Sequence, residues 1–206
     1  MRRNKMVGNT KVIGITGGVG SGKSHVCKLI TEHLGYPVLD SDSISRKQME
    51  PGGRVLESVI REFGKQYENE DGSLNRSALA ELVFNDDEAL KKLNSLTHPA
   101  VIEEINEKIN EYAEEGIPFV FVESALAFDA GYRSFCDEIW LVSAPENIRR
   151  YRLKKGRGYS DERISSLFSE QMPEEEMRKI CDREICNGGM VGDIELCYQL
   201  EAGIGL

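Results

Sequence analysis

Eight consecutive residues fit the pattern Gly-x-x-x-x-Gly-Lys-Ser: Gly17, Gly18, Val19, Gly20, Ser21, Gly22, Lys23 and Ser24. Glycines let the backbone curl until successive N–H groups point inward, and such a nest at a helix N-terminus binds phosphate oxygens. Lys23 is then expected to act catalytically on the β- and γ-phosphates of ATP, while the Ser24 hydroxyl ligates Mg²⁺. The alternative is a glycine-rich turn without a ligand. A lysine at the positive end of a helix dipole counts against it, since that placement is disfavoured by about 0.3–1 kcal/mol without a nearby anion.

Two aspartates follow the second predicted strand, in the run Asp40-Ser41-Asp42. A carboxylate at this position can accept a hydrogen bond from an acceptor hydroxyl and aim it in line with the γ-phosphate of ATP. We assign this catalytic role to Asp42. Asp40 or Asp42 can instead cap the helix that is expected to begin near Ser43, and the two aspartates can also divide these roles.

A dense basic cluster follows the fourth predicted strand and consists of Arg149, Arg150, Arg152, Lys154, Lys155 and Arg157. Such a cluster is commonly a solvated helix face. Here it follows the carboxyl end of a strand, where ligands bind in open α/β sheets, so we favour a lid that closes over the triphosphate. A guanine-specific switch protein would need an Asn-Lys-x-Asp tetrad late in the chain, and the only Asn-Lys pair is Asn4-Lys5. A kinase is therefore favoured over a nucleotide-binding switch.

Two further residues are candidates on weaker grounds. His98 precedes Pro99, which is expected to begin a new helix, so His98 is either a packed or capping histidine or a ligand contact. Glu123 follows the third predicted strand, where a carboxylate often assists Mg²⁺ through water.

Short apolar runs alternate with helical patterns along the chain. The predicted strands are residues 11–16, 36–39, 117–122 and 138–142, with a weaker fifth around Ile185. The helix after the glycine-rich segment is expected to end at Gly35. Some 75 residues of helical pattern separate the second and third strands, too many for a plain crossover. The sequence therefore predicts an α/β fold with a five-stranded parallel sheet and an inserted helical region.

Composition excludes several classes of protein. The chain has 206 residues, a formal net charge of −9 and five cysteines without a Cys-x-x-Cys pair. No apolar run is long enough to span a membrane, and no apolar stretch follows the basic start as in a secretory signal. Nucleic acid is not expected as a partner, because its phosphates favour broad basic surfaces. We expect a cytoplasmic protein with free thiols.

Taken together, these motifs resemble the dephospho-CoA kinase family. The resemblance is carried by residues 15–24, by Asp40-Ser41-Asp42 and by Leu96-Thr97-His98-Pro99, and it extends over roughly residues 11 to 190. It implies a three-layer P-loop NTPase fold. It also implies transfer of phosphate from ATP to the ribose 3′-hydroxyl of dephospho-coenzyme A, the last step of coenzyme A synthesis. Another small-molecule hydroxyl remains the alternative acceptor. A monomer or small homo-oligomer is expected.

The resemblance also assigns roles to individual residues. Asp42 matches the acceptor-activating aspartate, His98 the histidine beside the coenzyme A site, and Arg152 the catalytic lid arginine, with Arg157 as its competitor. The predicted acceptor-binding residues are Asp40, Asp42, His98 and Asp129. The predicted ATP-binding residues are the eight of the glycine-rich segment together with His25 and Arg157, and the predicted metal ligand is Ser24.

Two departures from the family pattern concern the site. His25 stands where the family usually has Thr, and residues 125–129 replace the usual Pro-Leu-Leu-Phe-Glu, with Asp129 keeping a carboxylate on a shorter arm. The chain is expected to form a single kinase domain in three parts. These are a core of residues 11–44, 116–144 and 182–206, a helical acceptor-binding region of residues 45–115, and a lid of residues 145–181.

Overall fold

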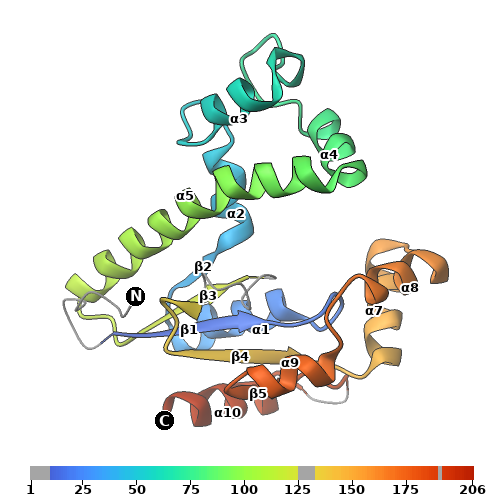
Figure 1. The fold of residues 1–206 in the computed structure, drawn as a ribbon. Coiled ribbons are helices and arrows are strands. Elements are labelled where there is room, and N and C mark those ends of the chain that lie inside the picture. The colour runs from blue at the N-terminus through green and yellow to red at the C-terminus, as the bar shows by residue number, and fades with distance from the viewer. Residues whose placement is uncertain (1–9, 125–132, 190–191) are drawn as a thin grey trace. The chain divides into compact units, whose positions relative to one another are not determined.

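A five-stranded sheet carries the glycine-rich segment. The computed structural model describes residues 10–124, 133–189 and 192–206, and within them the strands lie in the order β2-β3-β1-β4-β5 (Figure 1). Strand β1 pairs in parallel with β3 and with β4, and β4 pairs in parallel with β5. The predicted α/β fold is therefore confirmed. The strands are β1 (Lys11–Thr16), β2 (Val38–Asp40), β3 (Phe119–Glu123), β4 (Glu138–Ser143) and β5 (Arg183–Cys186).

The central strands consist mostly of buried apolar residues, as is usual for a parallel sheet that is covered on both faces. Helix α1 (Lys23–Leu29), the π-helical turn Ile30–Leu34 and helix α10 (Asp193–Ile204) contact one another and share a core with the sheet. Within this core the rings of Phe121 and Trp140 meet edge to face at 5.7 Å. The turn ends at Gly35, whose φ of 73° suits glycine and matches the predicted stop.

Three helices follow β4 in the predicted lid. They are α7 (Glu146–Arg157), α8 (Asp161–Ser169) and α9 (Glu174–Ile180). Helix α7 ends at Gly158 in the left-handed conformation, and Ser160 caps α8 by accepting a hydrogen bond from the Arg163 N–H.

Residues 40–110 form a compact unit of their own, distinct from the unit that carries the sheet. Its small apolar core consists of Val55, Leu56, Val59, Leu74 and Leu79. Gln48 is buried and donates hydrogen bonds to the Ala100 carbonyl and to Glu104, which fastens α2 to α5. The helices are α2 (Ser41–Gln48), α3 (Leu56–Phe63), the 3₁₀ turn Lys65–Tyr67, α4 (Arg76–Asn85) and α5 (Asp87–Glu114).

The prediction that Pro99 begins a new helix is wrong. Pro99 lies inside α5, which runs through it as one helix of 28 residues (Figure 1). A proline there removes one backbone hydrogen bond. Before the proline, Leu93 and Leu96 pack against the apolar core of the unit, and after it Val101 and Ile105 are buried. Packing on both sides of the proline keeps the two halves in one helix.

Candidate functional site

The segment Gly17–Ser24, hereafter the phosphate loop, joins β1 to α1. Strand β1 ends at Thr16 and helix α1 begins at Lys23, so the loop lies at the N-terminus of a helix. Gly17, Gly20 and Gly22 have φ values of 151°, 80° and 92°. Only glycine adopts such conformations without strain, which explains these three residue types.

A cavity of about 480 Å³ opens against this loop. It brings together most of the predicted ATP-binding residues and both candidate lid arginines, because the end of α7 lies across from the start of α1. The lining residues are Gly18, Val19, Gly20, Gly22, Lys23, Ser24, His25, Arg152, Leu153, Gly156, Arg157 and Gln171. Gly17 and Ser21 belong to the loop but do not line the cavity.

Lys23 and Ser24 stand in the first turn of α1. The Lys23 ammonium donates a hydrogen bond to the Gly17 carbonyl at 2.7 Å, which folds its side chain back over the loop. The Ser24 hydroxyl donates to the Glu123 carboxylate at 3.4 Å, so the end of β3 meets the start of α1. A hydroxyl beside a carboxylate is a donor set that suits Mg²⁺, which usually takes one or two protein oxygens together with substrate phosphates and water.

Arg152, on α7, forms hydrogen bonds with the loop. Its guanidinium donates to the Ser21 carbonyl at 3.0 Å and to the Asn187 side chain at 2.9 Å. Asn187, which is buried after β5, also donates to the Ser21 carbonyl at 2.9 Å. Burial lowers the pKa of Arg152 below its usual range, although an arginine stays charged. Arg157 lines the same cavity with an exposed side chain.

Three residues in contact with the loop were not predicted as site residues. Arg149 donates to the Val19 carbonyl, Gln171 accepts from the Val19 N–H, and Asn187 binds Ser21. Arg149 belongs to the basic cluster, Gln171 precedes Met172-Pro173, and Asn187 precedes Gly188-Gly189. Nothing in those segments indicates a contact with the loop, because each contact depends on how distant elements pack.

His25 follows Ser24 in α1 and lines the cavity. Its ring Nε2 lies 2.7 Å from the Asp193 carboxylate at the start of α10. The imidazole therefore links the cavity to the C-terminal helix, a contact that the sequence pattern does not reveal.

The predicted acceptor residues lie mostly in the helical unit. Asp40 caps α2: its carboxylate accepts hydrogen bonds from the N–H groups of Asp42 and Ser43 and from the Ser43 hydroxyl. Asp42 stands exposed in the first turn of that helix, and His98 lies half-buried in the middle of α5. Asp129 lies outside the described residues.

Comparison with known proteins identifies the family. A family model described as dephospho-CoA kinase matches residues 11–193. The dephospho-CoA kinase of Carboxydothermus hydrogenoformans is 40% identical over 180 residues, covering 87% of this chain and 87% of its own. That of Dehalococcoides mccartyi is 36% identical, covering 93% of this chain and 96% of its own.

Solved structures agree on the fold. The protein TT1252 from Thermus thermophilus is 35% identical with a TM-score of 0.78, and the match covers 96% of this chain and 97% of the other. A shikimate kinase from Acinetobacter baumannii is only 15% identical with a TM-score of 0.52, covering 95% and 94% of the two chains, so the likeness is one of fold alone. Among the described residues, every helix is too short or too polar to cross a membrane. On the family model and the relatives above, this chain belongs to the dephospho-CoA kinase family.

Proposed function

We propose that this chain transfers the γ-phosphoryl group of ATP to the ribose 3′-hydroxyl of dephospho-coenzyme A, giving ADP and coenzyme A. Membership of the family supports the choice of substrates. The observation that carries the phosphotransfer chemistry is the cavity that brings Lys23, Ser24 and Arg152 together against the phosphate loop.

On the nucleotide side, the loop N–H groups bind the β-phosphate while Lys23 spans the β- and γ-phosphates. Ser24 holds Mg²⁺, and Glu123 lies near enough to its hydroxyl to assist. When bound, the ion neutralises charge that develops between the β- and γ-phosphates during transfer. Arg152 and Arg157 approach from the lid of residues 145–181, whose closure excludes water and prevents wasteful ATP hydrolysis.

On the acceptor side, we assign the 3′-hydroxyl to Asp42. Asp40 is already engaged as a helix cap through both of its carboxylate oxygens, which leaves Asp42 as the exposed carboxylate of the pair. Phosphoryl transfer passes through a loose transition state, so Asp42 chiefly positions the hydroxyl and has modest base character. His98 and Asp129 contribute to acceptor binding, together with the helical region of residues 45–115.

The proposed substrates and the net charge bear on the location and the partners of the enzyme. We propose that it acts in the cytoplasm as a monomer or small homo-oligomer, with ATP and dephospho-coenzyme A as its partners. A net charge of −9 disfavours nucleic acid as a partner.

An ADP-release assay with four acceptors side by side tests the proposal: dephospho-coenzyme A, adenosine, shikimate and gluconate. We expect a strong preference for dephospho-coenzyme A. Preference for another of the four would overturn the acceptor and leave a small-molecule kinase. Binding of nucleotide with no acceptor-stimulated ADP release would point to a switch protein instead.

A further inference from the structure

Val19, the third residue of the phosphate loop, is held at both of its backbone polar groups by the lid. Its N–H donates to the Gln171 side-chain oxygen at 2.9 Å, and its carbonyl accepts from Arg149 Nε at 2.9 Å. Gln171 lies between α8 and α9, and Arg149 lies on α7. One loop residue therefore contacts two separate segments of the lid.

The Arg149 side chain is itself fixed in place. Its guanidinium stacks over the Phe168 ring at 4.3 Å, and Nη1 lies 3.6 Å from the Glu174 carboxylate. Only 11% of the Arg149 side chain is exposed. Burial lowers the pKa of the guanidinium and the Glu174 carboxylate partly offsets this, so the group stays charged. A cation held on three sides is a rigid donor.

The loop makes room for this arginine. Gly18 occupies an unrestricted position of the motif and does not have a positive φ, so its backbone does not require glycine. A Cβ atom at Gly18 would lie 2.8 Å from Arg149 Cζ, which is far inside van der Waals contact. At Gly20, a Cβ would lie 2.9 Å from the Arg149 carbonyl oxygen. The absence of a side chain at Gly18 and Gly20 therefore leaves the space that Arg149 occupies.

Arg149 does not line the cavity, whereas Val19, Gly20 and Arg152 do. Arg149 therefore contacts the loop without facing the cavity. A peptide unit is planar and trans, so holding the Val19 carbonyl toward Arg149 turns the Gly20 N–H to the opposite side. Arg152 and Asn187 hold the Ser21 carbonyl in the same manner, which directs the Gly22 N–H.

We propose that Arg149 is a positioning residue for nucleotide binding, which sets the Val19–Gly20 peptide so that the Gly20 N–H faces the phosphates. It contacts the loop carbonyl and not the nucleotide. The inference rests on the proposed function, because it takes the cavity to be the ATP site. It is independent of which acceptor the enzyme uses.

Calorimetric titration of the variants Arg149→Met and Arg149→Lys with MgATP and MgADP tests the role. Lysine keeps the charge but loses the Nε donor and the planar stack on Phe168. A positioning role predicts that the Kd of both nucleotides rises by a similar factor of about ten, the usual worth of one hydrogen bond to a charged group. A direct contact with the γ-phosphate would weaken ATP alone, and that result would overturn the proposal.

The matched control is Arg163→Met. The Arg163 guanidinium also stacks on an aromatic ring, that of Tyr159 at 4.4 Å, and within the described residues its side chain forms no hydrogen bond with the loop. Nucleotide affinity is expected to be unchanged in this variant. A comparable loss would mean that lid charge or lid folding, and not the Val19 contact, sets the affinity.

A double-mutant cycle with Gly18→Ala separates positioning from general damage. The added methyl group displaces the guanidinium, so Gly18→Ala alone should weaken both nucleotides about as much as Arg149→Met does. In the Arg149→Met background the same change should add little. If the factors by which the two single variants raise the Kd multiply in the double variant, the proposal is overturned. Wild-type nucleotide affinity in the Arg149 variants would also overturn it. If Arg149→Met fails to fold, as judged by thermal melting, Arg149→Lys and Gly18→Ala carry the test.

The outcomes also distinguish this inference from the proposed function. A wild-type protein that takes up no nucleotide would overturn both. A wild-type protein that binds ATP but phosphorylates a different acceptor would overturn the proposed substrate and leave the role of Arg149 standing.

Discussion

The phosphate loop and the helical unit of residues 40–110 present their proposed functional groups in different ways. In the loop many of the groups are backbone N–H groups, which the Lys23 and Ser24 side chains supplement, and three glycines with positive φ set the path of the chain. Side chains from α7 and the segment after β5 hold the carbonyls of Val19 and Ser21. In the helical unit the proposed groups are side chains on regular helices, with Asp42 exposed at the start of α2 and His98 half-buried within α5.

This difference decides how much of the function of each region can be predicted from its sequence. A site built from backbone demands particular residue types at particular spacings, because only glycine permits the required conformations. A site built from exposed helical side chains leaves no such mark, since most helices carry exposed carboxylates. The proposed role of His98 therefore rests on the family resemblance, and that of Asp42 rests on its position and on the engagement of Asp40 as a cap, whereas the proposed role of the loop follows from the geometry of the loop itself. The effects of mutations in the two regions should therefore differ in kind.

The largest expected effect is at Lys23. Replacement by alanine removes the cation that we propose to span the β- and γ-phosphates, and kcat/KM for ATP should fall by about 10²–10³-fold. The fold should survive, because the Lys23 side chain lines the cavity and does not belong to the buried apolar core. Steady-state kinetics and thermal melting check both statements. Lys28→Ala, on the exposed face of the same helix, serves as the control, and near-normal turnover by Lys23→Ala would remove the loop from the mechanism.

The neighbouring aspartates should respond in opposite ways. Asp42→Asn should lower kcat by about 10²-fold while the Kd of ATP stays unchanged, because the lost interaction forms mainly in the transition state. Asp40→Ala should instead lower the free energy of unfolding by about 1 kcal/mol, the usual cost of losing a helix cap. Denaturant titration and single-turnover kinetics distinguish them. An Asp42→Asn enzyme with normal kcat would leave the acceptor side without its proposed base.

The same contrast sets the limits of prediction from sequence. Strand β1 was predicted at its observed bounds, because an apolar run that ends at a glycine cluster has few other structures open to it. The catalytic role was assigned to Asp42, but which aspartate caps the helix was left open, since either carboxylate could reach the helix N-terminus. The structure identifies Asp40 as the cap, because its carboxylate accepts hydrogen bonds from the Asp42 and Ser43 N–H groups.

What the sequence did not reveal depends on packing between distant segments. Pro99 was expected to start a helix, but tertiary packing on either side of it outweighs the local preference. The basic cluster predicted a lid, without saying that Arg149 faces the loop carbonyl and Arg157 the open cavity. That distinction depends on Phe168 and Glu174, which no local pattern connects to residue 149.

A smaller effect is expected at His98. If it contacts the acceptor, His98→Ala should raise the KM of dephospho-coenzyme A by about three- to tenfold, the range for one lost hydrogen bond, with the Kd of ATP unchanged. Acceptor titrations at saturating ATP measure the KM. A lower melting temperature with an unchanged KM would identify a packed histidine, and His98→Gln, which keeps a hydrogen-bonding side chain, controls for volume.

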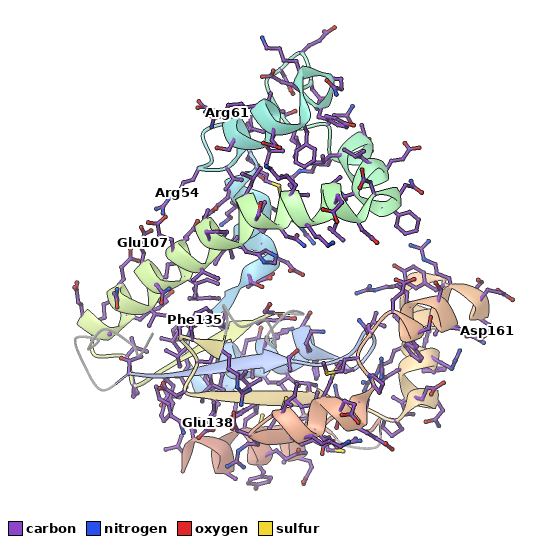
Figure 2. All side chains as sticks on the ribbon, viewed as in Figure 1. Arg54, Arg61, Glu107, Phe135, Glu138 and Asp161 are labelled. Atoms are coloured by element: carbon purple, nitrogen blue, oxygen red, sulfur yellow. The ribbon has the colours of Figure 1, made fainter. Side chains whose placement is uncertain are left out.

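The smallest effects concern two glutamates, one in each unit, whose pKa values lie below the usual range. Arg54 lowers the pKa of the exposed Glu107 by a hydrogen bond and its charge (Figure 2). Burial raises the pKa of Glu138, but hydrogen bonds from Lys11 and the Trp140 indole outweigh it. A carboxyl group whose folded pKa is depressed stabilises the protein above its unfolded pKa of about 4.3, and this stabilisation is lost as pH falls through the folded pKa.

Glu107→Gln and Glu138→Gln should therefore each lower the melting temperature at pH 7, by no more than a few degrees, and the difference from wild type should vanish below about pH 3. The salt dependence of the melting temperature should distinguish the two variants. At 0.5 M NaCl the effect of Glu107→Gln should largely disappear, because ionic screening weakens an exposed ion pair, whereas the effect of Glu138→Gln should persist. Melts followed by Trp140 fluorescence and by circular dichroism measure both. Equal salt sensitivity would mean that the Glu138 cluster is as solvated as the surface pair, so that partial burial does not protect it.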